Sequence, residues 1–268
     1  MIDPEIKHTQ TDANQNIGGA DKQEKNEKII RLIKAIVMNP ERGKFIDESV
    51  IKYKYYNSFN YFLLSRENQN VNLTLGITSA KQGEGKTLIS CNMAVSFAMG
   101  SQKKTILVDL NVANPNLHRI FGVQLAPGLT EGLISSEIIV SRTMIENLDV
   151  LTAGSTLIPH ENLFANNSKL EGSSSIASRA MLGLDQLAAF RDLIYSLEQN
   201  YELILVDMPA INSVSVPTLF ANQLHGLVVV VHSGKTKKEE VDAIFQRINE
   251  RQVLGFVLNR FDLQQKYN

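Results

Sequence analysis

The strongest chemical signal in the sequence is an eight-residue segment rich in glycine and lysine. It reads Ala80-Lys81-Gln82-Gly83-Glu84-Gly85-Lys86-Thr87 and is called the phosphate-binding loop below. The segment matches the pattern G-x-x-x-x-G-K-[ST], with Ala80 in the position of the first glycine. Gly83 and Gly85 permit backbone conformations that turn successive N–H groups inward, where they can bind phosphate oxygens. The pattern therefore predicts a site for the phosphates of a nucleotide.

Two side chains of this loop are expected to act on the phosphates. The Lys86 ammonium should reach the β- and γ-phosphates, and the Thr87 hydroxyl should ligate Mg²⁺. The helix predicted to begin directly after the loop adds the positive end of its dipole. The residues predicted to contact the nucleotide here are Lys81, Gln82, Gly83, Glu84, Gly85, Lys86, Thr87 and Leu88.

Two aspartates lie at the ends of apolar runs elsewhere in the chain. Asp109 ends the strand predicted from TILVDL, and Asp207 ends the strand predicted from LILVD. Both carboxylates should reach the edge of the sheet at which the phosphate-binding loop opens. There one can orient the attacking oxygen or a water on Mg²⁺, and the other can hold the metal through water. We predict Lys86, Asp109 and Asp207 as catalytic residues, and Thr87 with both aspartates as metal ligands. The alternative is that each aspartate caps the turn after its strand.

The elements that must position these groups alternate between strand and helix. Six short, nearly all-apolar runs predict strands whose two faces are both covered: LTLGIT, TILVDL, LDVLT, LILVD, LVVVV and GFVLN. Helices are predicted over residues 86–99, on the row Leu187, Phe190, Ile194 and Leu197, and on the row Val241, Ile244, Phe245 and Ile248. This alternation predicts an α/β fold with a doubly wound, mostly parallel sheet.

The chain divides into three predicted regions. Residues 1–27 are polar and are predicted to be a disordered arm, and residues 28–68 a helical segment. Residues 69–268 form the nucleotide-binding domain, with a mobile Ser/Asn/Gly-rich insertion at about 166–178. Within the helical segment, residues 28–38 have the spacing of a short basic amphipathic helix. Its apolar face would pack on its own domain, or it would bind a membrane surface or a partner helix.

Composition narrows the partners and the compartment. Lys and Arg number 27 against 28 Asp and Glu, so the net charge of −1 offers no global attraction for nucleic acid, and none is expected as a partner. A single cysteine fits a reducing compartment, and neither a secretory leader nor a spanning apolar run stands out. We therefore expect a cytoplasmic protein that can dock on a membrane component.

Together these segments resemble the bacterial polysaccharide-assembly tyrosine autokinases, P-loop proteins related to the MinD/ParA ATPases. The resemblance rests on TSAKQGEGKT, ILVDLNVANPNLHRIFG, GLTEGL, NLDVLTAG, YELILVDMPA and VLNR, and it covers roughly residues 73–260. It implies an ATP- and Mg²⁺-dependent kinase of capsule or exopolysaccharide production, located at the inner face of the cell membrane. It also implies a membrane-spanning chain-length regulator as partner, with self-association. By the same resemblance, Asn259 contacts the adenine.

Three departures from the family pattern affect that implication. The family has a second aspartate where this chain has Asn111, and a basic residue where it has Ala113 and Asn114. Losing a carboxylate beside Mg²⁺ weakens metal coordination, so slower phosphotransfer is expected. The charged family motif for ring assembly aligns with Asn57, Asn60 and Leu63, and the C-terminal tyrosine cluster is reduced to Tyr267.

These departures leave two further hypotheses open. One is a nucleotide-gated scaffold without useful catalysis, whose bound ATP sets its affinity for a membrane partner. The other is a MinD/ParA-like dimerising ATPase, in which Lys81 contacts nucleotide across the dimer. The simpler interpretation of Lys81 is a solvent-facing lysine of the loop.

Overall fold

One mixed sheet forms the centre of the molecule in a computed structural model that describes residues 29–33, 72–135, 137–155, 185–212 and 218–260. Within these ranges eight strands occur in the order β1-β4-β5-β3-β6-β2-β7-β8. Their bounds are β1 Ile29–Ile33, β2 Leu73–Ser79, β3 Thr105–Asp109, β4 Glu137–Arg142, β5 Leu148–Leu151, β6 Leu203–Asp207, β7 Gly226–His232 and β8 Val253–Asn259. Neighbouring strands are parallel except β4 and β5, which are antiparallel.

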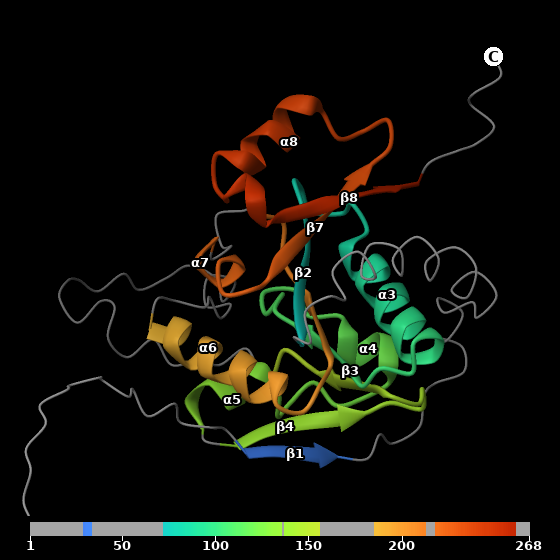
Figure 1. Ribbon diagram of the computed structural model, residues 1–268, viewed down its shortest axis with the longest axis vertical. Coiled ribbons are helices and arrows are strands. Elements are labelled where there is room, and N and C mark those ends of the chain that lie inside the picture. Colours follow the sequence, from blue (N-terminus) through green and yellow to red (C-terminus); the bar gives the residue numbers. More distant parts are fainter. Residues whose placement is uncertain (1–28, 34–71, 136, 156–184, 213–217, 261–268) are drawn as a thin grey trace, which may run out of the picture.

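Helices cover both faces of this sheet (Figure 1). Their bounds are α3 Lys86–Gly100, α4 Leu117–Phe121, α5 Leu129–Ile134, α6 Asp185–Glu198, α7 Thr218–Ala221 and α8 Lys238–Phe245, with a 3₁₀ turn at Glu250–Gln252. Buried side chains of α3 and α4 share one apolar cluster with the sheet, and those of α5, α6, α7 and α8 share another. This doubly wound arrangement confirms the predicted fold class.

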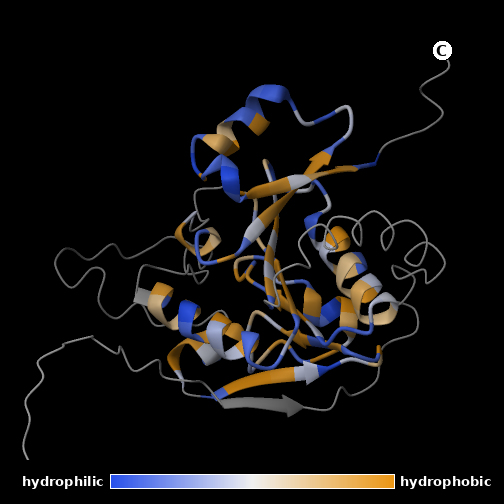
Figure 2. Cartoon of the chain, in the orientation of Figure 1, coloured by the Kyte–Doolittle hydropathy of each residue, from blue (hydrophilic) through white to orange (hydrophobic). Residues whose placement is uncertain are grey.

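The central strands are mostly apolar, as expected for strands whose two faces are both covered by helices. Every residue of β3, β5 and β6 is buried, and the strands of the sheet are largely orange, the hydrophobic colour, in Figure 2. Parallel pairing of β3 with β6 sets Asp109 directly opposite Asp207. The pairing of β2 with β6 brings the end of β2, and so the phosphate-binding loop, to the same edge. The six predicted strands are all present.

The prediction of a helix over residues 28–38 is wrong for residues 29–33. These residues form β1, which pairs in parallel with β4 from Ile29 opposite Glu137 to Ile33 opposite Ser141. The segment contains three isoleucines, and β-branched residues favour strands. An isolated helix of this length is marginal in water, so pairing with a strand edge more than 100 residues away can override the local pattern.

Other predictions differ from the structure in extent or lie outside it. Strand β4 did not stand out in the sequence, and it pairs antiparallel with β5 through Ser141 and Arg142. Helix α8 ends at Phe245, so Ile248 belongs to the following turn, although its side chain is buried. The predicted arm, the rest of the 28–68 segment, the 166–178 insertion and Tyr267 lie outside the described residues. Within the described ranges, no helix combines the length and apolar character that crossing a membrane requires.

Candidate nucleotide-binding site

The phosphate-binding loop connects the end of β2 to the start of α3. Gly83 and Gly85 have φ angles of 85° and 95°, a region that favours glycine. A Cβ atom on Gly85 would lie 2.1 Å from Nδ2 of Asn259, so the Asn259 side chain would have to move. Gly85 also forms the N-cap of α3, and its carbonyl accepts the Ile89 N–H at 3.0 Å. The first amides of α3 therefore face the loop, as a phosphate site requires.

The Lys86 side chain is folded into this loop rather than extended into solvent. Only 7% of the residue is exposed, and its Nζ donates to the Lys81 carbonyl at 3.5 Å, the long limit for a hydrogen bond. Burial lowers the pKa of Lys86, and the negative charges of Asp207 and Glu84 offset part of that shift. The ammonium is thus weakly bonded and close to carboxylates, so it remains available to a phosphate oxygen.

Asp207 lies at the end of β6 with 1% exposure. Its Oδ1 accepts a hydrogen bond from Ser90 Oγ at 3.0 Å, and the Thr87 hydroxyl also donates to this carboxylate. Burial raises the pKa of Asp207 to about 6, although these two hydrogen bonds and the charge of Lys86 act in the opposite direction. Three residues from the loop and α3 therefore orient one buried carboxylate.

Asp109 lies opposite Asp207 and is bound by backbone amides. Its Oδ1 accepts the Asn111 N–H at 3.1 Å, and its Oδ2 accepts those of Asn116 and Leu117 at 3.0 and 3.1 Å. The carboxylate therefore caps the turn after β3 and the start of α4. Burial, followed by repulsion from Asp207, raises the pKa of Asp109 to about 7 against the effect of the three amides. Capping and a role at the site are compatible, because a carboxylate has about four lone-pair sites and three are used.

These groups fit Mg²⁺ by the chemistry of their donor atoms. The Thr87 hydroxyl and the two carboxylates are oxygen donors, the ligands that Mg²⁺ prefers. Two buried carboxylates that face each other with raised pKa values gain from a nearby dication. Within the described ranges, no group of three or more His, Cys, Asp and Glu side chains could hold a metal alone. A metal here would therefore rely on phosphate oxygens and water for its remaining ligands, as Mg²⁺ at nucleotide sites does.

The outer side of the loop contacts the region from β7 to β8. Glu84 is buried; its carboxylate accepts the Lys81 N–H at 3.0 Å and the Thr236 hydroxyl. Asn259 donates from Nδ2 to the Glu84 carbonyl at 2.8 Å, and its Oδ1 accepts the Arg260 N–H at 2.9 Å. The amide of Asn259 thus supports the loop, and its contact with adenine stays a prediction.

The other residues predicted to contact nucleotide are exposed to solvent. Gln82 and Leu88 are exposed, and the Lys81 ammonium forms an ion pair of 2.8 Å with Glu240 of α8. Sequence reasoning missed Ser90, Thr236 and Glu240. Ser90 follows Lys86 by four residues and so shares its helix face, which was a usable signal. Thr236 and Glu240 gave no signal in the sequence, since the residues they contact, Glu84 and Lys81, are more than 150 positions away along the chain.

A strand, a glycine-rich loop and a helix N-terminus, with a buried lysine near Asp207 and a second aspartate on the next strand, define the class of P-loop nucleotide-binding proteins. The sequence matches the CobQ/CobB/MinD/ParA nucleotide binding domain over residues 75–268. It is 31% identical over 188 residues to tyrosine-protein kinase YwqD of Bacillus subtilis, spanning 68% of this chain and 70% of YwqD. The chain therefore belongs to the CobQ/CobB/MinD/ParA family and, within it, to the bacterial tyrosine-protein kinases.

Other relatives and solved structures agree with this placement. Tyrosine-protein kinase CpsD of Streptococcus pneumoniae is 28% identical, over 78% of this chain and 85% of CpsD. The succinoglycan biosynthesis transport protein ExoP of Rhizobium meliloti is 27% identical, over 71% of this chain and 22% of ExoP. Among structures, the chimerical protein CapA2B2 matches with TM-score 0.61 and 25% identity, over 81% of this chain and 91% of that one. The VpsO kinase domain matches with TM-score 0.60 and 25% identity, over 81% of this chain and 98% of the VpsO chain.

Proposed function

We propose that this chain binds ATP with Mg²⁺ at the phosphate-binding loop and transfers the γ-phosphoryl group to tyrosine. The observation that carries the proposal is the buried Lys86 ammonium close to the carboxylate of Asp207, which lies opposite Asp109 on the next strand, in a chain related to tyrosine-protein kinases. Lys86 would neutralise charge on the β- and γ-phosphates. Thr87 and the two aspartates would hold Mg²⁺. The metal ion would neutralise negative charge on the phosphate oxygens and so reduce their repulsion of the attacking hydroxyl. Phosphoryl transfer of this type depends mainly on positioning and electrostatics, which such a site supplies.

Capsule or exopolysaccharide assembly is the proposed context. The relation to a succinoglycan biosynthesis transport protein supports it. The proposed partner is a membrane-spanning chain-length regulator, which would bring the chain to the inner face of the cell membrane. If so, the purified chain will sediment with membranes that contain the regulator and stay in the supernatant with membranes that lack it. Equal sedimentation with both membranes would contradict the proposed partner.

The acceptor tyrosine would be the half-buried Tyr195 of α6, a tyrosine outside the described ranges, or one on another protein. Two of the seven tyrosines, Tyr195 and Tyr201, lie within the described residues. Tyr201 is 2% exposed and donates its hydroxyl to Asp149 at 2.9 Å, so a kinase cannot reach it without unfolding that region.

Incubation of the purified chain with radiolabelled ATP and Mg²⁺ tests the activity. Released phosphate and phosphotyrosine are scored together, and nucleotide binding is followed by calorimetry. We expect Lys86→Ala to lose phosphotyrosine and most binding, because it removes the ammonium that faces the phosphates. Lys238→Ala is the matched control, since this lysine is exposed on α8. Tight binding without either product would favour the nucleotide-gated scaffold instead, and absence of binding would overturn the proposal.

A further inference from the structure

Glu240, in the first turn of α8, connects that helix to the loops on both sides of the nucleotide site. Its Oε1 lies 2.8 Å from Nζ of Lys81 in the phosphate-binding loop. Its backbone carbonyl accepts a hydrogen bond of 3.0 Å from Nδ2 of Asn212, which follows β6 and Asp207. Its Oε2 accepts the Lys237 N–H at 2.9 Å and so caps α8. One residue therefore touches both nucleotide-facing loops and fixes the start of its own helix.

Lys81 divides its contacts between the loop and α8. Its backbone N–H donates to Glu84, and its carbonyl accepts Lys86 Nζ and, at 2.6 Å, Ser79 Oγ. The main chain of Lys81 thus belongs to the phosphate site. Its side chain, 48% exposed, turns outward to the Glu240 carboxylate, which is 27% exposed. The ammonium is paired with a carboxylate instead of facing the phosphate site.

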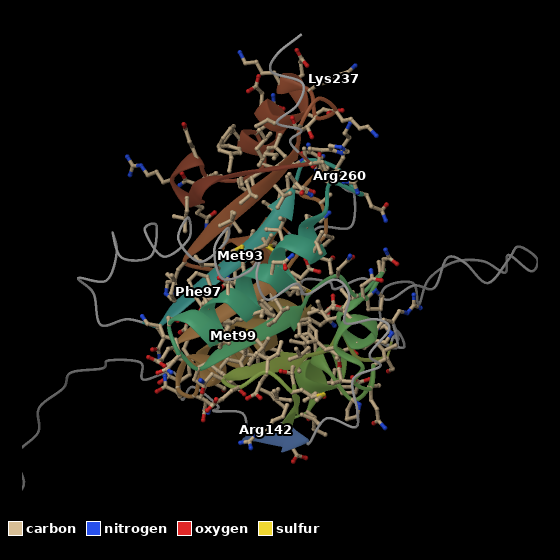
Figure 3. The ribbon with its side chains drawn as sticks, turned by 90° about the vertical axis from the view of Figure 1, so that its right-hand side faces the viewer. Met93, Phe97, Met99, Arg142, Lys237 and Arg260 are labelled. Atoms are coloured by element: carbon tan, nitrogen blue, oxygen red, sulfur yellow. The ribbon has the colours of Figure 1, made fainter. Side chains whose placement is uncertain are left out.

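Charges of both signs lie near this ion pair. The pKa of His232, at the end of β7, is lowered by its partial desolvation and then by Arg260, Lys235 and Lys81, while Glu84 raises it. Lys237 and Arg260 lie at the same end of the molecule, next to α8 and β8 (Figure 3). Among these charges, the Glu240 carboxylate is the one that pairs with the Lys81 ammonium. A polyphosphate that entered here would compete with Glu240 for that lysine.

Asn212 provides a second sign that this junction can rearrange. Its Oδ1 is buried, and within the described part of the chain it has no hydrogen-bond partner. A buried acceptor without a donor is costly, and it gains from any donor brought within reach. Among the described residues, the Asn212 amide is held on its Nδ2 side, by the same residue that pairs with Lys81.

We propose that Glu240 is a positioning residue of the nucleotide site: it holds the Lys81 ammonium on α8, and a nucleotide phosphate must displace its carboxylate to recruit that lysine. The inference rests on the proposed nucleotide site and deepens it by assigning a residue that limits nucleotide affinity. When Lys81 binds phosphate, it leaves Oε1 of Glu240, and the link between the loop and α8 is lost. Oε2 continues to cap α8.

The test is nucleotide affinity in a double-mutant cycle, measured with a fluorescent ATP analogue and Mg²⁺. Glu240→Gln removes the charge, while its amide oxygen can still accept the Lys237 N–H. We expect it to lower the dissociation constant about two- to fivefold, the range expected for breaking a solvent-exposed ion pair. Glu239→Gln is the matched control, because it removes the same charge from an exposed neighbouring position. Its dissociation constant should stay near that of the wild type.

Lys81→Met completes the cycle. In that background Glu240→Gln should have no effect, because the lysine whose release improves binding is absent. An equal gain with and without Lys81 would show a general charge effect and overturn the inference, as would wild-type affinity in Glu240→Gln alone. Failure of the wild type to bind nucleotide would instead refute the proposed function, so the two outcomes are distinguishable.

Discussion

Replacing Asp207 by asparagine should make the protein more stable above neutral pH while it removes a group that the site needs. The pKa of Asp207 is about 6 against an ordinary value of 3.8, and that of Asp109 is about 7. The folded chain therefore keeps protons that the unfolded chain has released, and it loses stability as pH rises from about 4 through these pKa values. For Asp207 this difference between the folded and unfolded pKa corresponds to about 3 kcal/mol of lost stability at about pH 8.

The asparagine should recover part of this free energy. Its side chain has the same shape, and the hydroxyls of Ser90 and Thr87 can still bond its amide. The variant gives up the attraction between Asp207 and Lys86, which reduces the gain. We expect an increase in the free energy of unfolding of about 1–2 kcal/mol at about pH 8 and almost none near pH 4. Asp109→Asn should gain less stability than Asp207→Asn. Both carboxylate oxygens of Asp109 accept backbone N–H groups in the wild type, so the amide nitrogen of the variant would face one of these donors.

Urea unfolding of both proteins across this pH range, without Mg²⁺ or nucleotide, measures the effect. A gain of this size would also raise the melting temperature by about 2–6 °C for a domain of this size. Addition of Mg²⁺ and ATP should reverse the order of stability, since the wild type alone keeps both carboxylates for the metal. A variant less stable than the wild type at pH 8, or a difference independent of pH, would refute the argument from the two buried charges.

Two further substitutions test the surroundings of the site and the far side of the sheet. Ser90→Ala should leave nucleotide affinity unchanged without Mg²⁺ but raise the Mg²⁺ concentration needed for tight binding several-fold, because Asp207 loses a hydrogen bond that orients it. A Mg²⁺ titration checks this, with the similarly buried Ser96→Ala on the same helix as control. Tyr201→Phe should cost about 1–3 kcal/mol in urea unfolding, since the buried Asp149 loses the hydroxyl that donates to it. It should leave phosphotyrosine formation intact, and a loss of phosphotyrosine without a loss of stability would contradict the structural role.

The local sequence was sufficient to locate the phosphate-binding loop and the strands around it. A strand, glycines at the turn and a lysine at the start of a helix are all determined within about 20 residues of chain, where backbone conformation depends on neighbours. The apolar runs that end in Asp109 and Asp207 likewise predicted two carboxylates at one edge, because parallel strands end together.

Contacts between distant segments were decided only by the tertiary structure. Residues 29–33 pair as a strand with β4, the charge of Lys81 meets Glu240, and Glu84 meets Thr236. None of these partners is within 100 residues of the other, so no local spacing could indicate them. The three amides on Asp109 and its repulsion by Asp207 also depend on packing, because burial and mutual distance set those pKa values. The sequence by itself therefore predicted the phosphate-binding loop and the two aspartates at its edge of the sheet. The folded arrangement decided how these groups are charged and held, and it added Ser90, Thr236 and Glu240 to their surroundings.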